Sequence, residues 1–173
     1  MFETILVPTD GSDHANKAVD LAADLGDKFK ARIVILHVLL RDATVSDLIT
    51  LCKRLKGPVE LTDKLAVVGD PSASSPTIYG PVPVRVPESL LEEVGYLITN
   101  NAMQLAKAKG AGNIEVHVRD GSPADLILTA AEHENADAIV MGSRGLGRIS
   151  EMLMGSVSHK VNHLSKCTCI TVK

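Results

Sequence analysis

The sequence predicts an α/β fold in which a doubly wound, parallel sheet of five strands is covered by helices on both faces. Short β-rich segments alternate with segments of helical periodicity along the 173 residues, and this alternation favours right-handed crossovers between parallel strands. The segment from Arg32 to Val38 is apolar almost throughout, as expected of a strand buried on both faces. The length fits one domain with a single core.

The expected elements follow in order along the chain. Strands are predicted at residues 2–7, 32–38, 114–118, 138–141 and 168–172, and helices at 12–29, 100–109, 123–134 and 156–164. Pro8 ends the first strand, and Ser12 and Asp13 offer an N-cap to the helix that follows. Pro123 opens a later helix, in a position that proline favours.

Residues 41–95 interrupt the alternation, because they are too long for a plain crossover. We predict that they form an insertion within a single domain of residues 1–173, with an added helix over 42–56. Regular structure is not expected over 69–87, because proline lacks the backbone N–H donor. Two alternatives stay open for the insertion: a disordered flap, or an ordered lid or partner surface. Its prolines are Pro58, Pro71, Pro76, Pro81, Pro83 and Pro87.

Composition and charge exclude several classes of protein. The chain has 18 basic and 21 acidic residues, a net charge of −3 and no basic stripe, which argues against nucleic-acid binding. Aromatic residues make up 2% of the sequence, too few to stack bases. The first residues lack the features of a signal peptide, and no apolar run is long enough to span a membrane. We therefore expect a cytoplasmic protein with no membrane partner.

The strongest functional signal is a glycine-rich segment directly after the strand at 138–141. Glycines allow a backbone to approach phosphates closely, and the free N–H groups where the next helix begins supply hydrogen-bond donors. Ser156 is expected at an N-cap position, where it can contact a phosphate or merely cap the helix. The structural alternative for the whole segment is a flexible connection. Its candidate nucleotide ligands are Met141, Gly142, Ser143, Arg144, Gly145, Gly147, Arg148, Gly155, Ser156 and Val157.

The second signal is the segment Pro8-Thr9-Asp10 after the first strand. Ligands of open α/β sheets bind beyond the carboxyl ends of strands, where the strand order reverses. The first strand and the strand at 138–141 are therefore predicted to be neighbours, with both segments beside one crevice. Asp10 is a candidate ligand for a ribose hydroxyl, or for Mg²⁺ shared with phosphates; the alternative is an aspartate that only supports a turn or caps a helix. Neither a GxGxxG nor a P-loop pattern is present.

These motifs resemble the universal stress protein family, in its ATP-binding branch. Its G-x2-G-x9-G-[ST] pattern is matched by Gly142, Gly145, Gly155 and Ser156, and its V-P-x-D-G-S start by residues 7–12. The resemblance implies a Rossmann-like sheet ordered 3-2-1-4-5, with adenine near Val38 and with ribose and phosphates near Asp10 and the glycine loop. It also implies ATP, ADP or AMP as ligand, with Mg²⁺, and a homodimer paired through Thr168 to Val172.

Three functions are consistent with these features. The first is a regulatory protein in which ATP acts as a switch by favouring one conformation. The second is an enzyme, either a slow ATPase or an adenylyl-transfer enzyme of related fold. The third is a dimeric scaffold with an empty site, which the intact glycine pattern disfavours. No acid–base pair or nucleophile is evident, and His159 and His163 lack the glutamate and third ligand of a zinc site.

Overall fold

The computed structural model describes residues 2–70, 85–147 and 154–173, and it contains one five-stranded sheet. All the strand pairs are parallel, in the order β3-β2-β1-β4-β5. The strands are β1 (Thr4–Pro8), β2 (Arg32–Val38), β3 (Ile114–Arg119), β4 (Ala138–Gly142) and β5 (Thr168–Val172). This architecture confirms the predicted fold class and strand order.

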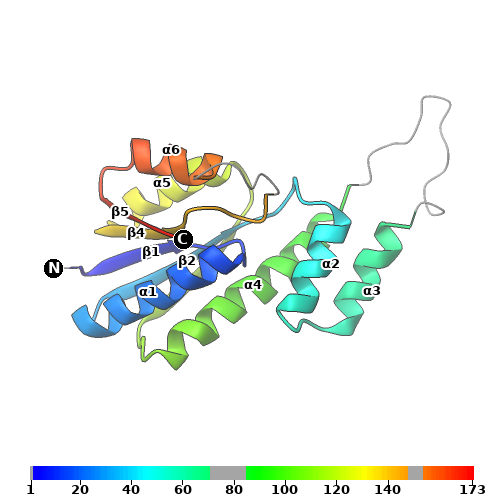
Figure 1. The fold of residues 1–173 in the computed structure, drawn as a ribbon, viewed down its shortest axis with the longest axis horizontal. Helices are drawn as coiled ribbons and strands as arrows, with labels where there is room; N and C mark the ends of the chain where they lie inside the picture. The colour runs from blue at the N-terminus through cyan, green and yellow to red at the C-terminus, as the bar shows by residue number, and fades with distance from the viewer. Residues whose placement is uncertain (1, 71–84, 148–153) are drawn as a thin grey trace.

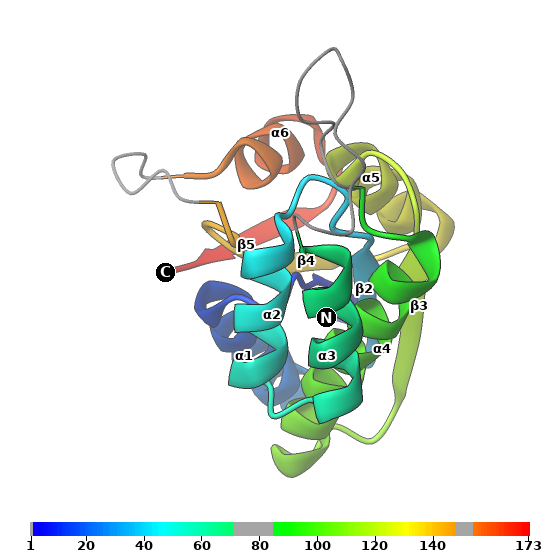
Figure 2. The ribbon, with the colours of Figure 1, turned by 90° about the vertical axis from the view of Figure 1, so that its right-hand side faces the viewer.

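Helices cover both faces of the sheet (Figure 1). One layer contains α1 (Asp13–Phe29) and α4 (Glu88–Ala108), and the other contains α5 (Pro123–His133) and α6 (Ser156–Leu164). Two further helices, α2 (Val45–Arg54) and α3 (Val59–Val68), lie beyond the end of the sheet at which the strands finish. Figure 2 looks onto that end, with α2 and α3 in the foreground.

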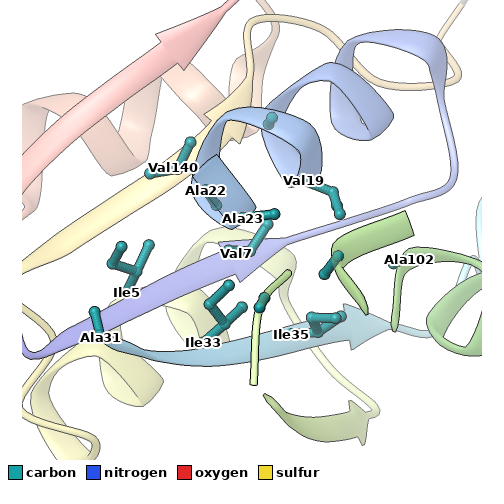
Figure 3. Close-up of a cluster of buried hydrophobic side chains, with 13 residues drawn as sticks. Ile5, Val7, Val19, Ala22, Ala23, Ala31, Ile33, Ile35, Ala102 and Val140 are labelled. Atoms are coloured by element: carbon teal, nitrogen blue, oxygen red, sulfur yellow. The ribbon is translucent and has the colours of Figure 1, made fainter. Parts of the chain in front are cut away.

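The core follows from the alternation of side chains along the buried strands. Ile33 and Ile35 of β2 point toward α1 and α4, whereas Val34 and Leu36 point toward α5 and α6. The α1 side of the core is shown in Figure 3. Helix α1 contributes mainly alanines to it, and such small side chains let a helix approach a sheet closely. The buried alanines of α1 in this cluster are Ala18, Ala22 and Ala23.

The helix before β3 is longer than the sequence predicted. We expected it from residue 100, but α4 begins at Glu88, inside the range interpreted as an insertion. Its buried positions Leu91, Val94, Ile98 and Ala102 repeat every three or four residues, so one apolar stripe runs through both halves of the helix. The proline-rich composition before it obscured this stripe.

The added helix over 42–56 is present as α2, and α3 follows it as a second helix that the sequence did not predict. Helix α3 buries only Leu61 and Leu65 and has no side-chain cap, so its periodic signal is weak. The two alternatives for the insertion were a disordered flap and an ordered lid or partner surface. Residues 71–84, which belong to it, lie outside the described residues.

A separate hydrophobic cluster, here called the cap cluster, joins α2, α3 and α4. Its fully buried members include Leu48, Leu51, Leu65 and Ile98. Leu146, which follows β4, packs against its edge. Nowhere in the described ranges is a helix both long and apolar enough to cross a bilayer.

Candidate functional site

The ends of β1 and β4 bring the two glycine-containing segments together. Ile5 pairs with Ala138 and Leu6 with Ile139 in the parallel register of the two strands. The strand order reverses here, because β1 also pairs with β2 on its other side. The loop after β1 (residues 9–12) and the glycine loop after β4 (residues 143–147) therefore begin side by side, at the carboxyl ends of two neighbouring strands. This neighbourhood was predicted from the sequence.

The carboxylate of Asp10 joins the two loops. Its Oδ1 accepts a hydrogen bond from the Ser12 amide at 3.0 Å, within its own loop. Its Oδ2 accepts one from the Leu146 amide at 2.9 Å, in the glycine loop. Hydrogen bonds to an ionised acceptor are stronger than those between neutral groups. A single half-buried side chain thus holds the glycine loop against the loop after β1.

Two serines make further contacts between the loops. Ser12 is the N-cap of α1, as predicted: its hydroxyl accepts from the Ala15 amide at 3.3 Å and lies 3.4 Å from the carbonyl oxygen of Arg144. Ser143 is 1% exposed, and its hydroxyl lies 3.0 Å from Nδ1 of His14. A serine so deeply buried is a poor nucleophile for an external substrate, so this Ser–His pair is a structural contact.

The glycines of the motif have different packing environments. A Cβ on Gly142 would lie 2.9 Å from backbone atoms of α1, so this glycine lets the loop pack on the helix. A Cβ on Gly145 would collide with the carboxylate of Asp10, whereas one on Gly147 would meet none of the described residues within 4 Å. A Cβ on Gly155 would make only ordinary contacts, from 3.6 Å. Gly145 is therefore the glycine that makes room for Asp10.

The start of α6 lies beside the glycine loop, and its cap differs from the predicted one. Gly155, not Ser156, is the N-cap, and Ser156 is the exposed first residue of the helix. The backbone of Gly155 is already in the extended conformation that a cap requires, so no side chain is needed to begin the helix. The Gly155 amide and the Ser158 hydroxyl both donate to the carbonyl oxygen of Ser143, at 2.8 and 2.7 Å. These bonds attach α6 to the glycine loop, and its amide-rich, positive end is the kind that binds anions.

A buried histidine supports the residue before Asp10. His37 is 0% exposed, and its Nδ1–H donates to the carbonyl oxygen of Thr9 at 2.8 Å. Its Nε2 is buried with no hydrogen-bond partner, beside Gly95, whose missing side chain leaves space for the ring. Burial lowers the pKa of His37, and the bond to Thr9 and the charge of Asp10 oppose that effect only in part. The ring is therefore neutral in the folded protein at neutral pH.

The other predicted ligands lie at the carboxyl ends of β1, β2 and β4 and in the first turn of α6, with one outside the described residues. Pro8 and Thr9 are buried at the end of β1, and Val38 ends the adjacent β2 with 8% of its surface exposed. Met141 is buried in β4 and Val157 half-buried in α6, both in the cluster beneath α5 and α6. Arg148 lies outside the described residues. In the ranges that the structure describes, no group of three or more His, Cys, Asp or Glu could hold a metal ion, so the predicted Mg²⁺ role of Asp10 would require oxygens from a ligand.

The structure adds three residues that the sequence analysis did not select. His14 contacts Ser143, the Leu146 amide binds Asp10, and Arg54 of α2 donates to the carbonyl oxygen of Gly11 at 2.6 Å. Leu146 lies within the glycine-rich segment, between Gly145 and Gly147, and His14 follows two residues after Ser12, so both were within reach of a search of the two segments. Arg54 is 43 residues from Gly11 in sequence, and no local pattern indicates that contact.

Comparisons with known proteins indicate one family. The universal stress protein family matches residues 1–173. Universal stress protein YxiE of Bacillus subtilis is 34% identical over 180 aligned positions, covering 100% of both chains. A solved universal stress protein in complex with cAMP superposes with a TM-score of 0.61 at 25% identity, covering 99% of this chain and 96% of that one. The universal stress protein from Archaeoglobus fulgidus in complex with dAMP shares the fold, with a TM-score of 0.60, 18% identity and coverage of 100% and 98%.

The environment of His37 predicts a pH dependence of folding stability. Its pKa in the folded protein lies below the ordinary value of 6.5, so the unfolded chain takes up the proton first as the pH falls. The free energy of unfolding should therefore decrease from about pH 6.5 down through the lower folded-state pKa. Urea unfolding at several pH values should show this loss in the wild type and a flatter profile in His37→Asn, whose amide retains a donor. The exposed control His159→Asn should keep the wild-type slope, and an equal slope in His37→Asn would contradict the assignment.

Proposed function

The chain belongs to the universal stress protein family, and we propose that it binds an adenine nucleotide at the ends of β1 and β4 and acts as a nucleotide-dependent switch in a stress response. ATP is the ligand we propose first, with ADP and AMP as alternatives. The observation that carries the proposal is the contact of Asp10 with the glycine loop: the Leu146 amide donates to its carboxylate, and the missing side chain of Gly145 makes room for that carboxylate.

Asp10 supplies the group that a ribose needs. An ionised carboxylate accepts hydrogen bonds and cannot donate them. The hydroxyls of a ribose can donate, so they are suitable partners for it. Both oxygens of Asp10 already accept from backbone amides. Each carboxylate oxygen keeps a second lone pair, so a ribose hydroxyl can either share Oδ2 with the Leu146 amide or replace that amide. We propose replacement, which would loosen the contact between the two loops.

Phosphates would lie toward α6. The first turn of a helix has amides without intrahelical partners, and α6 begins at Ser156 directly beside the glycine loop. Arg144 brings a positive charge to that loop, and Mg²⁺ would be shared between phosphate oxygens and Asp10. Adenine would lie toward Val38 at the end of β2. A solved relative at 25% identity is a complex with cAMP, which supports an adenine nucleotide as the ligand class.

The switch would operate through the glycine loop. A ligand shifts a conformational equilibrium only by its difference in affinity for the two states. In the state described here Leu146 is fixed twice, by its amide on Asp10 and by its side chain on the cap cluster. A nucleotide that displaces the amide would favour a state in which Leu146 is released, and the packing of α2 and α4 would respond.

We also propose a homodimer through β5. This strand is at the edge of the sheet and pairs only with β4. The Thr168 amide and the Val172 carbonyl face β4, where they bond to Asp137 and Ser143; by alternation the backbone groups of Cys169 and Thr171 face outward. An exposed edge of this kind is suited to pairing with another strand.

Nucleotide binding can be tested with two glycine variants, one in the glycine loop and one before β3, at the opposite end of the sheet. Gly145→Ala should displace the Asp10 carboxylate and weaken binding at least about tenfold, the equivalent of about 1.4 kcal/mol. Gly112→Ala makes the same change at an exposed glycine before β3, with nothing within 4 Å among the described residues, and should stay within about twofold of wild type. Calorimetric titration of nucleotide-stripped protein with AMP, ADP and ATP, each with Mg²⁺, measures the affinities.

Two measurements accompany this titration. Circular dichroism checks that each variant is folded; we expect Gly145→Ala to fold, because Asp10 is a side chain that can move and Gly145 has no left-handed φ. Phosphate release followed in parallel distinguishes a switch, with negligible turnover, from the alternative of a slow ATPase. Folded wild type that binds none of the three nucleotides would refute the proposal, as would equal losses in Gly145→Ala and Gly112→Ala.

The dimer can be tested at the outward amide of β5. Thr171→Pro removes that donor while leaving the bonds between Val172 and β4, and it should convert a dimer to a monomer in light scattering coupled to size exclusion. The side chain of Thr171 also accepts from Asn162 at 2.8 Å, so Asn162→Ala is the matched control and should remain a dimer. A monomeric wild type, or a dimeric Thr171→Pro, would contradict pairing through β5.

A further inference from the structure

Helix α2 contacts the loop that carries Asp10 through an arginine outside both nucleotide motifs. The Nη2 of Arg54 donates to the carbonyl oxygen of Gly11 at 2.6 Å, in a partly buried position. Its Nη1 lies 3.3 Å from Oδ1 of Asp13, the first residue of α1. One guanidinium thus binds the loop on both sides of Ser12, whose amide donates to Asp10.

The conformation of Gly11 explains why such support matters. Gly11 has a φ of +77°, in the left-handed region that glycine tolerates at low cost, so the chain turns sharply directly after Asp10. Leu51 and Ile98 would each lie 3.2 Å from a Cβ at this position. The turn is therefore enclosed by α2 and α4, and the bond from Arg54 fixes its carbonyl from the same side.

The two contacts of Arg54 differ in strength. Asp13 is 76% exposed in its side chain and Arg54 39% exposed, and exposed ion pairs contribute little. The bond to the Gly11 carbonyl is charge-assisted and partly buried, which makes it the stronger contact. Arg54 is therefore held mainly by the backbone of the loop rather than by an opposite charge.

We propose that Arg54 is a positioning residue for nucleotide binding: from α2 it fixes the turn after Asp10 so that the carboxylate is presented to the ribose. The inference rests on the proposed function, because it names a residue that prepares the same site. It makes α2 a part of that site, although the helix lies outside both motifs. Acting through the loop, Arg54 should affect every ligand that carries the ribose, with or without phosphates.

Three variants test this role. Arg54→Gln removes the positive charge and shortens the side chain, and Arg54→Lys retains a charged donor. Lys53→Gln is the control: it removes a positive charge from the neighbouring residue, which lines a hollow between α2 and α3. Affinities for adenosine, AMP and ATP are measured calorimetrically. We expect Arg54→Gln to lose about fivefold or more for all three ligands alike, Arg54→Lys to recover most of this loss, and Lys53→Gln to bind as wild type.

The pattern of losses decides between the possible roles. A loss that grows from adenosine to ATP would mean that Arg54 contacts phosphates directly, and no loss would mean that the turn needs no such support; either result overturns the inference. Hydrogen exchange of the Ser12 and Leu146 amides in ligand-free protein gives a second readout, and both should exchange faster in Arg54→Gln than in Lys53→Gln. If wild type binds none of the three ligands, the proposed function fails, and this exchange comparison still supports or refutes the positioning role.

Discussion

The two hydrogen bonds accepted by the carboxylate of Asp10 are the interaction on which the rest of the site depends. The carboxylate accepts amides from both loops, at 3.0 Å from Ser12 and 2.9 Å from Leu146, and the parallel pairing of β1 with β4 makes this possible. Gly145 is needed because any side chain there would collide with that carboxylate. If a ribose replaces the Leu146 amide on this carboxylate, as we propose, the stability of the closed loops and the affinity for the ligand are opposed.

The cap cluster connects this site to the part of the molecule beyond the sheet. Leu146 packs against its edge, and Leu51 and Ile98 enclose the turn at Gly11. Both loops therefore contact one packed group of side chains from α2 and α4. Close-packed cores respond to a displaced side chain by repacking rather than by continuous deformation, which gives a physical route from the ends of the strands to α2.

The sequence predicted the sheet more completely than the contacts of the site. Apolar runs and helix caps were sufficient for the strands and for α1, and the glycine spacing indicated the two loops. The cap of α6 was misassigned to Ser156, because sequence alone does not tell whether glycine or serine takes the extended conformation. The bond between His14 and Ser143 spans 129 residues, and the contact of Arg54 with Gly11 depends on where α2 packs, so neither can be inferred from local patterns.

Amide NMR during a titration with AMP can follow the exchange of partners at Asp10. If the ribose replaces the Leu146 amide, the Leu146 resonance should shift saturably and lose its hydrogen-bonded character. Gly112, an exposed residue before β3 with open space around it, should not move. Saturable binding that leaves the Leu146 amide unchanged would contradict the account, because the nucleotide would then bind without displacing that amide from Asp10.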